Sequence, residues 1–329
     1  MKKKILGKDL EVSAVGYGCM GLSHAYGNAT AHNEAVKIIR SAYENGYTFF
    51  DTARCYVGTE ENGAISDNEE LVGEALKDVR NHVVIATKFG VNHSTDGLVT
   101  DSRPDSIRKS VEVSLKRLNV EHIDLYYQHR IDLDVPIEEV AGLMSELIDE
   151  GKITHWGMSE ADEEHIRRAH TVCPVTAIQN RYSMMSRWHE SLFSVLEELN
   201  IGFVAFSPLA NGILSDAYTK EDVFDQNGDY RRLMPQFQSE SYGQNEELLN
   251  LIRRLAEENN ATPSQIALSW MIQKKPYIVP IPGTRNMERL KENLGAANVN
   301  MTPAQIEQID TALNQMKMSE VFGGSKILK

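Results

Sequence analysis

Three short apolar segments of the chain end in a residue that can carry charge or transfer a proton. The segment YTFFD ends at Asp51, VVIATK ends at Lys88 and IDLYYQH ends at His129. Tyr56 follows Asp51 by five residues. If these side chains converge, they can deliver a proton to an oxygen atom that is gaining negative charge. A carbonyl oxygen gains such charge when hydride adds to its carbon, so these residue types indicate carbonyl reduction.

Each of the four side chains has an expected part in that chemistry. The pKa of a free tyrosine is about 10, and an adjacent ammonium, here Lys88, is expected to lower the pKa of Tyr56. Asp51 is expected to pair with Lys88, since a buried cation needs an anionic partner, and His129 to hydrogen-bond a substrate oxygen. No side chain supplies hydride, so the hypothesis requires a nicotinamide. Taken singly, each charged residue is more often a salt bridge or a cap.

The three segments belong to a series of eight that are rich in β-branched and aromatic residues, and most are followed by a stretch of helical periodicity. The series covers residues 14–18, 47–51, 83–88, 123–129, 154–159, 176–180, 202–208 and 277–283. Strands that alternate with helices predict the α/β class, and eight such units predict a (β/α)8 TIM barrel. A doubly wound open sheet is the alternative. In a barrel the C-terminal ends of all strands share one rim, where the chemical residues would meet.

Helix signals are clear at several places along the chain. Residues 33–45 have helical periodicity, and Gly46 is placed to end that helix. The sequences TPSQ and TPAQ begin at Thr262 and Thr302. Each has the threonine, proline and glutamine of a helix start with a capping box.

The segments outside this repeating pattern also have expected places. Residues 2–13 are typical of a β-hairpin with its turn at Gly7, which we expect at the bottom of the barrel. Two connections, residues 92–102 and about 217–243, are long for a compact domain. Long connections are usually binding loops, so we expect both over the C-terminal face of the barrel.

Gly16, Gly18 and Gly21 have the G-x-G-x-x-G spacing of a dinucleotide-binding turn. That motif needs a helix that starts at the glycines and an acidic residue about 20 positions later. The residues after Gly21 lack helical periodicity, and the next strand ends at Asp51, too far along the chain. We therefore expect the glycines to allow a tight turn beside a ligand and not to form a Rossmann site.

Composition narrows the possible partners. The 329 residues carry a formal net charge of −13, which disfavours nucleic acid and anionic membranes. No apolar run is long enough to span a membrane and no signal peptide is apparent, so a cytoplasmic location is expected. The three cysteines suggest neither disulfides nor a metal site. No linker divides the chain, which predicts a single domain over residues 1–329.

The sequence resembles the aldo-keto reductases from about Lys4 to Met316. The stretch YTFFDTARCY is similar to the family's Asp-Thr-Ala-x-x-Tyr signature, IATK has its lysine and IDLYYQH its histidine. The resemblance implies a (β/α)8 barrel and NADPH-dependent reduction of aldehydes or ketones. It also implies that Tyr56 is the general acid, that Asp51 and Lys88 tune it, and that His129 orients the carbonyl group.

The resemblance extends to the residues that bind the cofactor. Ser159 and Gln179 match positions that hold the nicotinamide carboxamide, and Phe206 matches the aromatic residue that stacks on the ring. The remaining matches are Ser207, Leu209 and Asn211 for the phosphates, and Gly283, Thr284, Arg285, Arg289 and Asn293 for the adenosine end. An arginine pair suits a 2′-phosphate, which favours NADPH over NADH.

Two positions depart from the family pattern. Glu160 stands where many members have asparagine, and the connection after Tyr56, VGTEENGAISD, is longer than usual. The departures leave the contacts of the cofactor carboxamide and the shape of the substrate pocket open. A different function, a cofactor-sensing binding subunit similar to the potassium-channel β-subunits, is the alternative. The natural carbonyl substrate, the direction of the reaction and the choice between monomer and homo-oligomer do not follow from the sequence.

Overall fold

The computed structural model describes residues 2–94, 97–224, 228–323 and 327–328. Within these residues, eight parallel strands form one sheet in the order β14-β13-β12-β11-β10-β7-β4-β3. The strands are β3 (Tyr17–Gly18), β4 (Phe49–Asp51), β7 (Val84–Phe89), β10 (Ile123–Gln128), β11 (Ile153–Ser159), β12 (Ala177–Arg181), β13 (Gly202–Phe206) and β14 (Ile278–Pro280). Each overlaps one of the eight segments predicted from the sequence, and β7, β11 and β12 extend one residue beyond theirs.

The two outer strands of this sheet meet and close it into a barrel. The backbone N–H of Gly16 donates to the carbonyl oxygen of Pro280 at 2.9 Å, and that of Gly18 to Pro282 at 3.4 Å. The (β/α)8 prediction is therefore confirmed, and the open doubly wound sheet is excluded. A Cβ atom on Gly18 would lie 2.7 Å from the carbonyl oxygen of Ile281, so this glycine permits the close approach at the seam.

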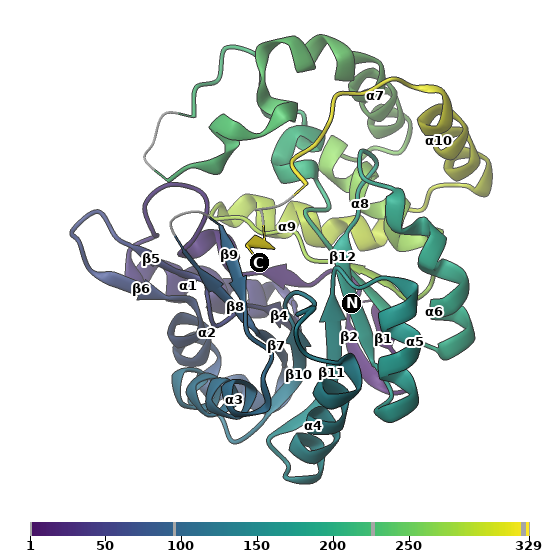
Figure 1. Ribbon diagram of the computed structural model, residues 1–329. Helices are drawn as coiled ribbons and strands as arrows, with labels where there is room; N and C mark the ends of the chain where they lie inside the picture. The colour runs from purple at the N-terminus through teal and green to yellow at the C-terminus, as the bar shows by residue number, and fades with distance from the viewer. Residues whose placement is uncertain (1, 95–96, 225–227, 324–326, 329) are drawn as a thin grey trace.

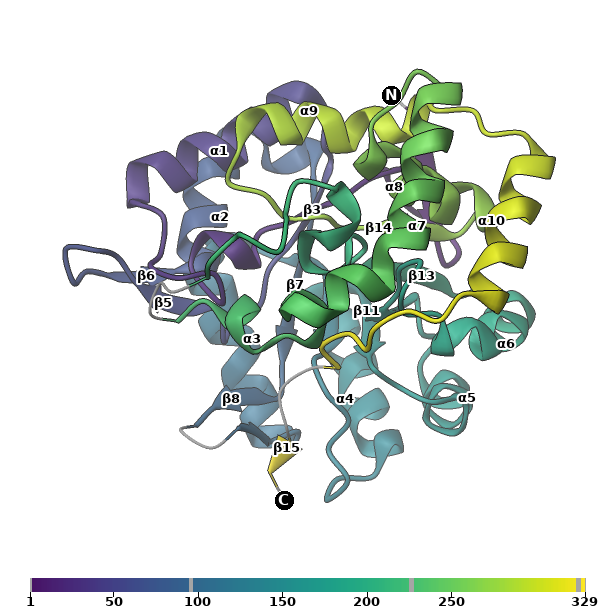
Figure 2. The ribbon, with the colours of Figure 1, turned by 90° about the horizontal axis from the view of Figure 1, so that it is seen from above.

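Helices surround the strands (Figure 1). One helix from each connection between successive strands, and one after the last strand, are in chain order α1 (His32–Asn45), α2 (Asn68–Leu76), α3 (Pro104–Leu118), α4 (Ile137–Asp149), α5 (Glu163–Val172), α6 (Phe193–Leu199), α8 (Pro263–Lys274) and α9 (Met287–Gly295). Seen from above, α9 runs beside α1 (Figure 2), which brings the last helix of the barrel next to the first.

The predicted helix boundaries agree closely with those of the structure. Gly46 ends α1 in a left-handed conformation with φ 108°. Thr262 and Thr302 form complete capping boxes at the starts of α8 and of α10 (Pro303–Gln315). These local signals act over a few residues, which is why they can be read without tertiary information.

The predicted hairpin covers the bottom of the barrel. Strands β1 (Lys3–Leu6) and β2 (Leu10–Ser13) pair antiparallel, and Gly7 has φ 60° in the turn. The hairpin side chains Leu6, Leu10 and Val12 are buried in the cluster that fills the barrel interior. The hairpin therefore seals the end opposite to the strand C-termini.

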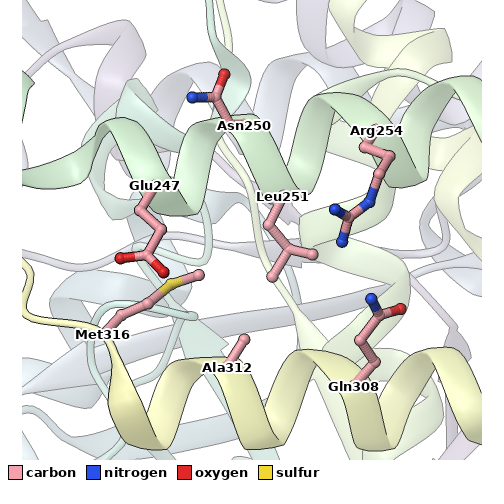
Figure 3. A pocket seen from close by; sticks show the side chains of 7 residues that line it. All are labelled: Glu247, Asn250, Leu251, Arg254, Gln308, Ala312 and Met316. Atoms are coloured by element: carbon pink, nitrogen blue, oxygen red, sulfur yellow. The ribbon is translucent and has the colours of Figure 1, made fainter.

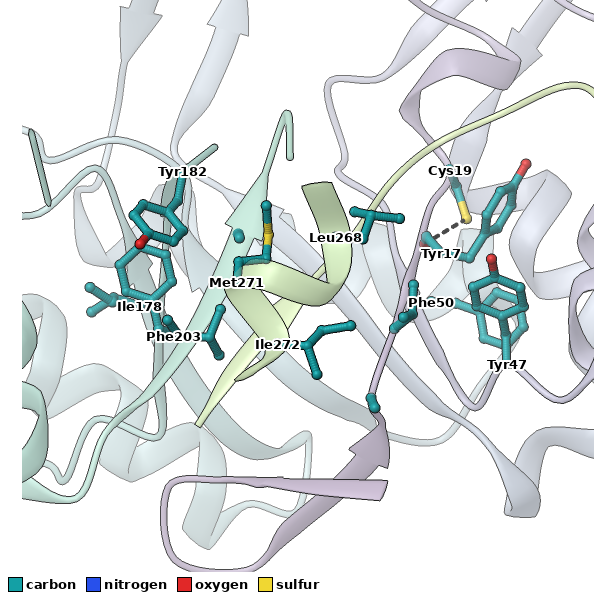
Figure 4. Close-up of a cluster of buried hydrophobic side chains, with 14 of the residues drawn as sticks. Tyr17, Cys19, Tyr47, Phe50, Ile178, Tyr182, Phe203, Leu268, Met271 and Ile272 are labelled. Atoms are coloured by element: carbon teal, nitrogen blue, oxygen red, sulfur yellow. Dashed lines mark hydrogen bonds between the residues drawn. The ribbon is translucent and has the colours of Figure 1, made fainter. Parts of the chain in front are cut away.

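Alternation along the strands separates the interior cluster from an outer one between strands and helices. In β10, Leu125 and Tyr127 belong to the interior cluster, whereas Tyr126 between them belongs to the outer one. Figure 4 shows part of the outer cluster, in which side chains of α8 are drawn together with Ile178 of β12, Phe203 of β13 and Phe50 of β4. The interior position that follows Tyr127 is His129, so the alternation directs its side chain into the barrel mouth.

The long connections contain structure that the sequence did not predict. Residues 92–102, expected to be a loop, include a hairpin of β8 (Val91–His93) and β9 (Leu98–Thr100), and residues 95–96 lie outside the described residues. The long connection after Tyr56 is likewise a hairpin, β5 (Val57–Thr59) and β6 (Ile65–Asp67).

The second long connection ends earlier than expected, because α7 (Ser239–Glu258) begins before Gly243. Residues 225–227 of this connection lie outside the described residues. Beyond α10 the chain returns to the barrel, and β15 (Ile327–Leu328) pairs with β9. In the part of the chain that the structure describes, no helix has the length and apolar character needed to span a bilayer. The single-domain organisation stays a prediction.

The hairpin at the barrel bottom leads to a test of stability. Replacing Leu6 by alanine should lower the free energy of unfolding by about 2–5 kcal/mol, because the side chain is fully buried in the interior. Ile5, its neighbour on the same strand, is 52% exposed, so Ile5→Ala should cost less than about 1 kcal/mol. Urea unfolding of both variants measures the difference. Equal losses would show that the hairpin does not seal the interior.

Candidate active site

A buried ion pair lies at the C-terminal ends of β4 and β7. The ammonium of Lys88 donates to the Asp51 carboxylate at 2.5 Å and to the Thr52 carbonyl oxygen at 2.7 Å. The second carboxylate oxygen of Asp51 accepts from the Gln179 amide at 2.6 Å. Both charged groups are nearly inaccessible to solvent. Such a pair persists only when its remaining hydrogen-bonding atoms are satisfied, which Thr52 and Gln179 do here.

Tyr56 and His129 lie beside this pair. The Lys88 nitrogen is 5.2 Å from the centre of the Tyr56 ring, and the rings of Tyr56 and His129 meet edge to face with centres 5.8 Å apart. The Cys55 sulfur lies 3.5 Å from Nδ1 of His129. The structure therefore brings together the four side chains on which the sequence analysis depends, from three strand ends and one loop.

Burial decides the protonation of these groups. The pKa of Tyr56 lies well above its ordinary value, because burial disfavours the phenolate and the Asp51 carboxylate repels it. The prediction that Lys88 lowers this pKa is therefore wrong, since its charge is balanced by Asp51. The pKa of His129 lies well below its ordinary value, because burial and the neighbouring Arg130 guanidinium disfavour the imidazolium. At neutral pH the mouth holds a protonated phenol and a neutral imidazole.

Further aromatic side chains that the sequence analysis missed line the mouth. The His24 ring stacks on Tyr56 with ring centres 6.0 Å apart and lies 4.7 Å from the His93 ring. Tyr230 meets His24 edge to face at 5.9 Å. These residues lie in loops without periodicity, so no pattern in the sequence indicates that they converge.

The two residues expected at the nicotinamide carboxamide are neighbours in the sheet. Ser159 and Gln179 are register partners at the ends of β11 and β12, and both are buried. Glu160 follows in a left-handed conformation with φ 55°, which asparagine tolerates better than glutamate does. Its Oε1 atom accepts from the backbone N–H of Arg181 at 2.8 Å. The glutamate therefore bonds to the backbone at the end of β12.

The residues expected at the cofactor phosphates follow β13. Phe206 is half-buried at the strand end, and Ser207, Ala210 and Asn211 have φ values of 50°, 48° and 62°. Leu209, between them, is half-buried against the outer cluster. Alternating right- and left-handed backbone of this kind can point successive N–H groups at an anion. The segment therefore suits a phosphate better than its side chains alone suggest.

The residues expected at the adenosine end lie at β14 and α9. Gly283 belongs to the barrel seam, where a Cβ atom would lie 2.6 Å from the carbonyl oxygen of Gly18. The carbonyl oxygen of Thr284 accepts from the Tyr17 hydroxyl at 2.7 Å. Arg289 is half-buried and Asn293 is buried. The predicted residues thus lie in one region of the structure. Gly283 also permits the close packing of the barrel seam.

Arg285 shows that this region can hold an anion. Its Nε donates to the carbonyl oxygen of Gly21 at 2.6 Å, which fixes the guanidinium. Its Nη2 is buried and has no hydrogen-bond partner among the described residues. A buried guanidinium nitrogen without an acceptor is unfavourable. The 2′-phosphate of NADPH would supply the missing acceptor, so the residues present fit that cofactor.

A separate groove of about 590 Å³ lies between α7 and α10, away from the barrel mouth. Figure 3 shows the side chains that line it. Met316, Leu251 and Ala312 form its apolar part. None of the residues predicted to act in chemistry or cofactor binding lines this groove, so the strand ends are the candidate active site.

Comparison with known proteins places this geometry in context. The model of the Aldo/keto reductase family matches residues 14–314. A soybean (Glycine max) protein named "Probable aldo-keto reductase 1" is 39% identical over 317 residues, which are 95% of this chain and 88% of the relative.

Two solved structures are also similar. The glycerol dehydrogenase of Gluconobacter oxydans has a TM-score of 0.83 at 27% identity, with 95% of each chain covered. An aldo/keto reductase of Klebsiella pneumoniae, in complex with NADP and acetate, has a TM-score of 0.72 at 24% identity. That match covers 96% of this chain and 98% of the other, and supports the fold.

His24, which is half-buried beside Tyr56, predicts a pH dependence of stability. Burial and the nearby His93 lower the pKa of His24 to about 4, so the unfolded chain binds a proton there below about pH 6.5 whereas the folded chain does not. Stability from this group is therefore lost as the pH falls. His24→Gln should lose about 2 kcal/mol less than the wild type between about pH 7 and pH 5. Urea unfolding at both pH values measures this difference.

The matched control replaces His82, which is exposed. His82→Gln should leave the pH dependence of unfolding close to that of the wild type. If His24→Gln and His82→Gln behaved alike, His24 would not be held neutral by the fold.

Proposed function

The chain belongs to the aldo/keto reductase family, and from this membership we propose that it reduces aldehydes or ketones to alcohols with NADPH. The observation that supports the proposal most directly is the convergence of the Lys88–Asp51 pair, Tyr56 and His129 at one end of the barrel. NADPH, when bound, supplies the hydride. The chain's own residues bind the carbonyl compound, orient it and supply the proton.

Tyr56 is the proposed proton donor. Burial keeps its hydroxyl group protonated at neutral pH, so the group is ready to donate to a carbonyl oxygen. As hydride adds to the carbon, that oxygen becomes far more basic than a free carbonyl, which drives the transfer. The phenolate left behind lies near the Lys88 ammonium, whose nitrogen is 5.2 Å from the ring centre. Asp51 holds this ammonium in place.

His129 is proposed to orient the carbonyl oxygen. Its imidazole is neutral, so one ring nitrogen carries hydrogen and the other accepts a hydrogen bond. Burial raises the pKa of the Cys55 thiol to about 11, and this thiol can donate to Nδ1 of His129. That contact leaves the hydrogen on Nε2, which can then donate to the substrate. Cys55 is thus a positioning residue for the imidazole.

The proposed cofactor site runs from the mouth to α9. Ser159, Gln179 and Phe206 would hold the nicotinamide end, and the left-handed segment after β13 would hold the phosphates. Arg285 and Arg289 would bind the 2′-phosphate, because a guanidinium forms charge-assisted hydrogen bonds with phosphate oxygens. The NADP found in the Klebsiella pneumoniae structure is consistent with this cofactor.

Removal of the Tyr56 hydroxyl tests the proposed acid. Tyr56→Phe should lower kcat for aldehyde reduction by about 10²–10³-fold, because the proton donor is lost, while NADPH still binds. NADPH oxidation against a panel of aldehydes measures the rate. Tyr43→Phe, on the outer helix α1, is the matched control and should keep wild-type activity. Wild-type rates in Tyr56→Phe would refute the role of this phenol, and tight NADPH binding by the wild type without any turnover would favour a cofactor-sensing subunit.

Cofactor preference tests the arginine pair. Arg285→Ala combined with Arg289→Ala should raise the Kd for NADPH at least about tenfold, because the contacts to the 2′-phosphate are lost. The Kd for NADH should change much less. Fluorescence titration measures both constants, with the exposed Lys291→Ala as a control for loss of charge on the same helix. Equal losses for the two cofactors would contradict the assignment.

A further inference from the structure

Two guanidinium groups in the barrel mouth have no part in the function proposed above. The central carbon of Arg181 lies 5.0 Å from the centre of the Phe206 ring, and that of Arg130 lies 6.0 Å from the same centre. Arg181 ends β12 and Arg130 follows β10 by two residues. They therefore approach one ring from different strands.

Arg181 is directed into the mouth by the alternation of its strand. Ala177 is part of the barrel interior and Gln179 reaches Asp51, so the next inward position is Arg181. The residue is only 5% exposed. Its side chain also lies over the ring of Phe322 at 5.9 Å, and cation–π contacts with the two rings hold it in place.

The guanidinium of Arg181 lacks an acceptor. Its Nε is buried without a hydrogen-bond partner, and no ion pair of this side chain occurs in the described part of the chain. Leaving such a charge buried and unpaired is strongly unfavourable. The arrangement therefore favours an anionic ligand that completes it.

Arg130 is half-buried, and only one of its guanidinium nitrogens forms hydrogen bonds within the described residues. Its Nη1 donates to the carbonyl oxygen of His129 at 2.6 Å and to the Ser159 hydroxyl at 3.1 Å. Within the described residues, its Nε and Nη2 form no hydrogen bond. These contacts fix the plane of the guanidinium and leave two N–H-bearing nitrogens for a ligand.

The nearest acidic residue is engaged elsewhere. Glu160 accepts from the backbone N–H of Arg181 and lies 3.6 Å from the His189 ring nitrogen. The Glu160 carboxylate reduces the positive charge of the mouth, although it forms no ion pair with Arg130 or Arg181. Burial is the main reason that the pKa of Arg181 is lowered; Glu160 and Tyr26 oppose the shift, and repulsion from Arg130 adds a smaller lowering.

We propose that Arg130 and Arg181 form a subsite for the carboxylate of an oxo-carboxylic acid, whose carbonyl group reaches Tyr56. The inference rests on the proposed reductase function. The charged groups of NADPH have other candidate partners, namely the segment after β13 and the arginines at α9. The nicotinamide of NADPH is uncharged, so a second cationic pair at this end of the site matches an anion of the substrate.

The position of the subsite determines which substrates can contact both Tyr56 and the arginine pair. Tyr56 follows β4, whereas the arginine pair follows β10 and β12, on a different part of the rim. One molecule can contact both only if its carbonyl and carboxylate groups are separated by a spacer. An aromatic aldehyde with a para carboxylate has such a spacer, and 4-methylbenzaldehyde is its uncharged match of similar shape.

Relative kcat/KM for these two aldehydes tests the proposal. The wild type should favour 4-carboxybenzaldehyde over 4-methylbenzaldehyde at least about tenfold, and Arg181→Met should lower this ratio about tenfold, because the charge-assisted hydrogen bonds are lost. Arg181→Lys should keep part of the preference, since it keeps the charge but not the fork of donors. Arg130→Met should lower the ratio independently. An unchanged ratio in both methionine variants overturns the proposal.

Two further measurements separate the alternatives. Arg103→Met removes an exposed arginine near the start of α3 and should leave the ratio unchanged, which controls for net charge. If Arg181→Met raises the Kd for NADPH about tenfold and leaves the ratio intact, the pair binds cofactor phosphate, and the proposal fails.

Binding without turnover distinguishes this subsite from the reductase function. Calorimetric titration with 4-methylbenzoate should show binding to the wild type that Arg181→Met weakens about tenfold. If no aldehyde is reduced but this difference is found, the reductase function fails and the subsite stands. If aldehydes are reduced but 4-methylbenzoate binds both proteins equally, the subsite fails and the reductase function stands.

Discussion

A closed barrel of parallel strands directs every second side chain into one interior, and the candidate active site depends on this constraint. Apolar side chains and the N-terminal hairpin fill the lower interior. A side chain at the last inward position of a strand therefore lies in the barrel mouth. Asp51, Lys88 and Phe206 stand at such positions, Gln179 stands one inward position before the end of β12, and His129 continues the same alternation one residue beyond its strand. Convergence of the site is thus a consequence of strand geometry.

Burial then decides which chemical forms these groups take. The Lys88–Asp51 pair is stable because Thr52 and Gln179 satisfy its remaining atoms. With its charge matched in this way, Lys88 does not dominate the field at Tyr56, and desolvation keeps the phenol protonated. The same desolvation keeps His129 neutral. A protonated phenol and an uncharged imidazole therefore coexist beside an ion pair.

The charge of the molecule is unevenly distributed. The chain as a whole is acidic, with a formal net charge of −13, yet the buried guanidinium nitrogens without a hydrogen-bond partner among the described residues include Nη2 of Arg285 and Nε of Arg181. Arg285 lies beside the glycine segment after β3, and Arg181 lies over Phe206. Such local cationic sites in an acidic protein favour small anions over polymers. Arg285 lies where the adenosine end of the proposed cofactor would bind, and Arg181 lies where the proposed substrate would bind.

Much of this could be read from the sequence because the signals are local. Strand segments, the helix ends at Gly46, Thr262 and Thr302, and the polar residues that close apolar runs are all patterns over a few neighbours. The resemblance to aldo-keto reductases, carried by such runs, is confirmed by the match over residues 14–314. Barrel topology then follows from the count and order of strands.

Tertiary structure alone decided the rest. His24 stacks on Tyr56 and also approaches His93 of β8, and the hairpins after Tyr56 and Phe89 form where the sequence indicates only long connections. The direction of the Tyr56 pKa shift depends on how much water and which charges surround the phenol. The Arg181 guanidinium is buried without an ion-pair partner among the described residues only because β12 ends in the mouth of a closed barrel. Spacing along a chain cannot encode these properties, because desolvation and contact arise from segments that are distant in sequence.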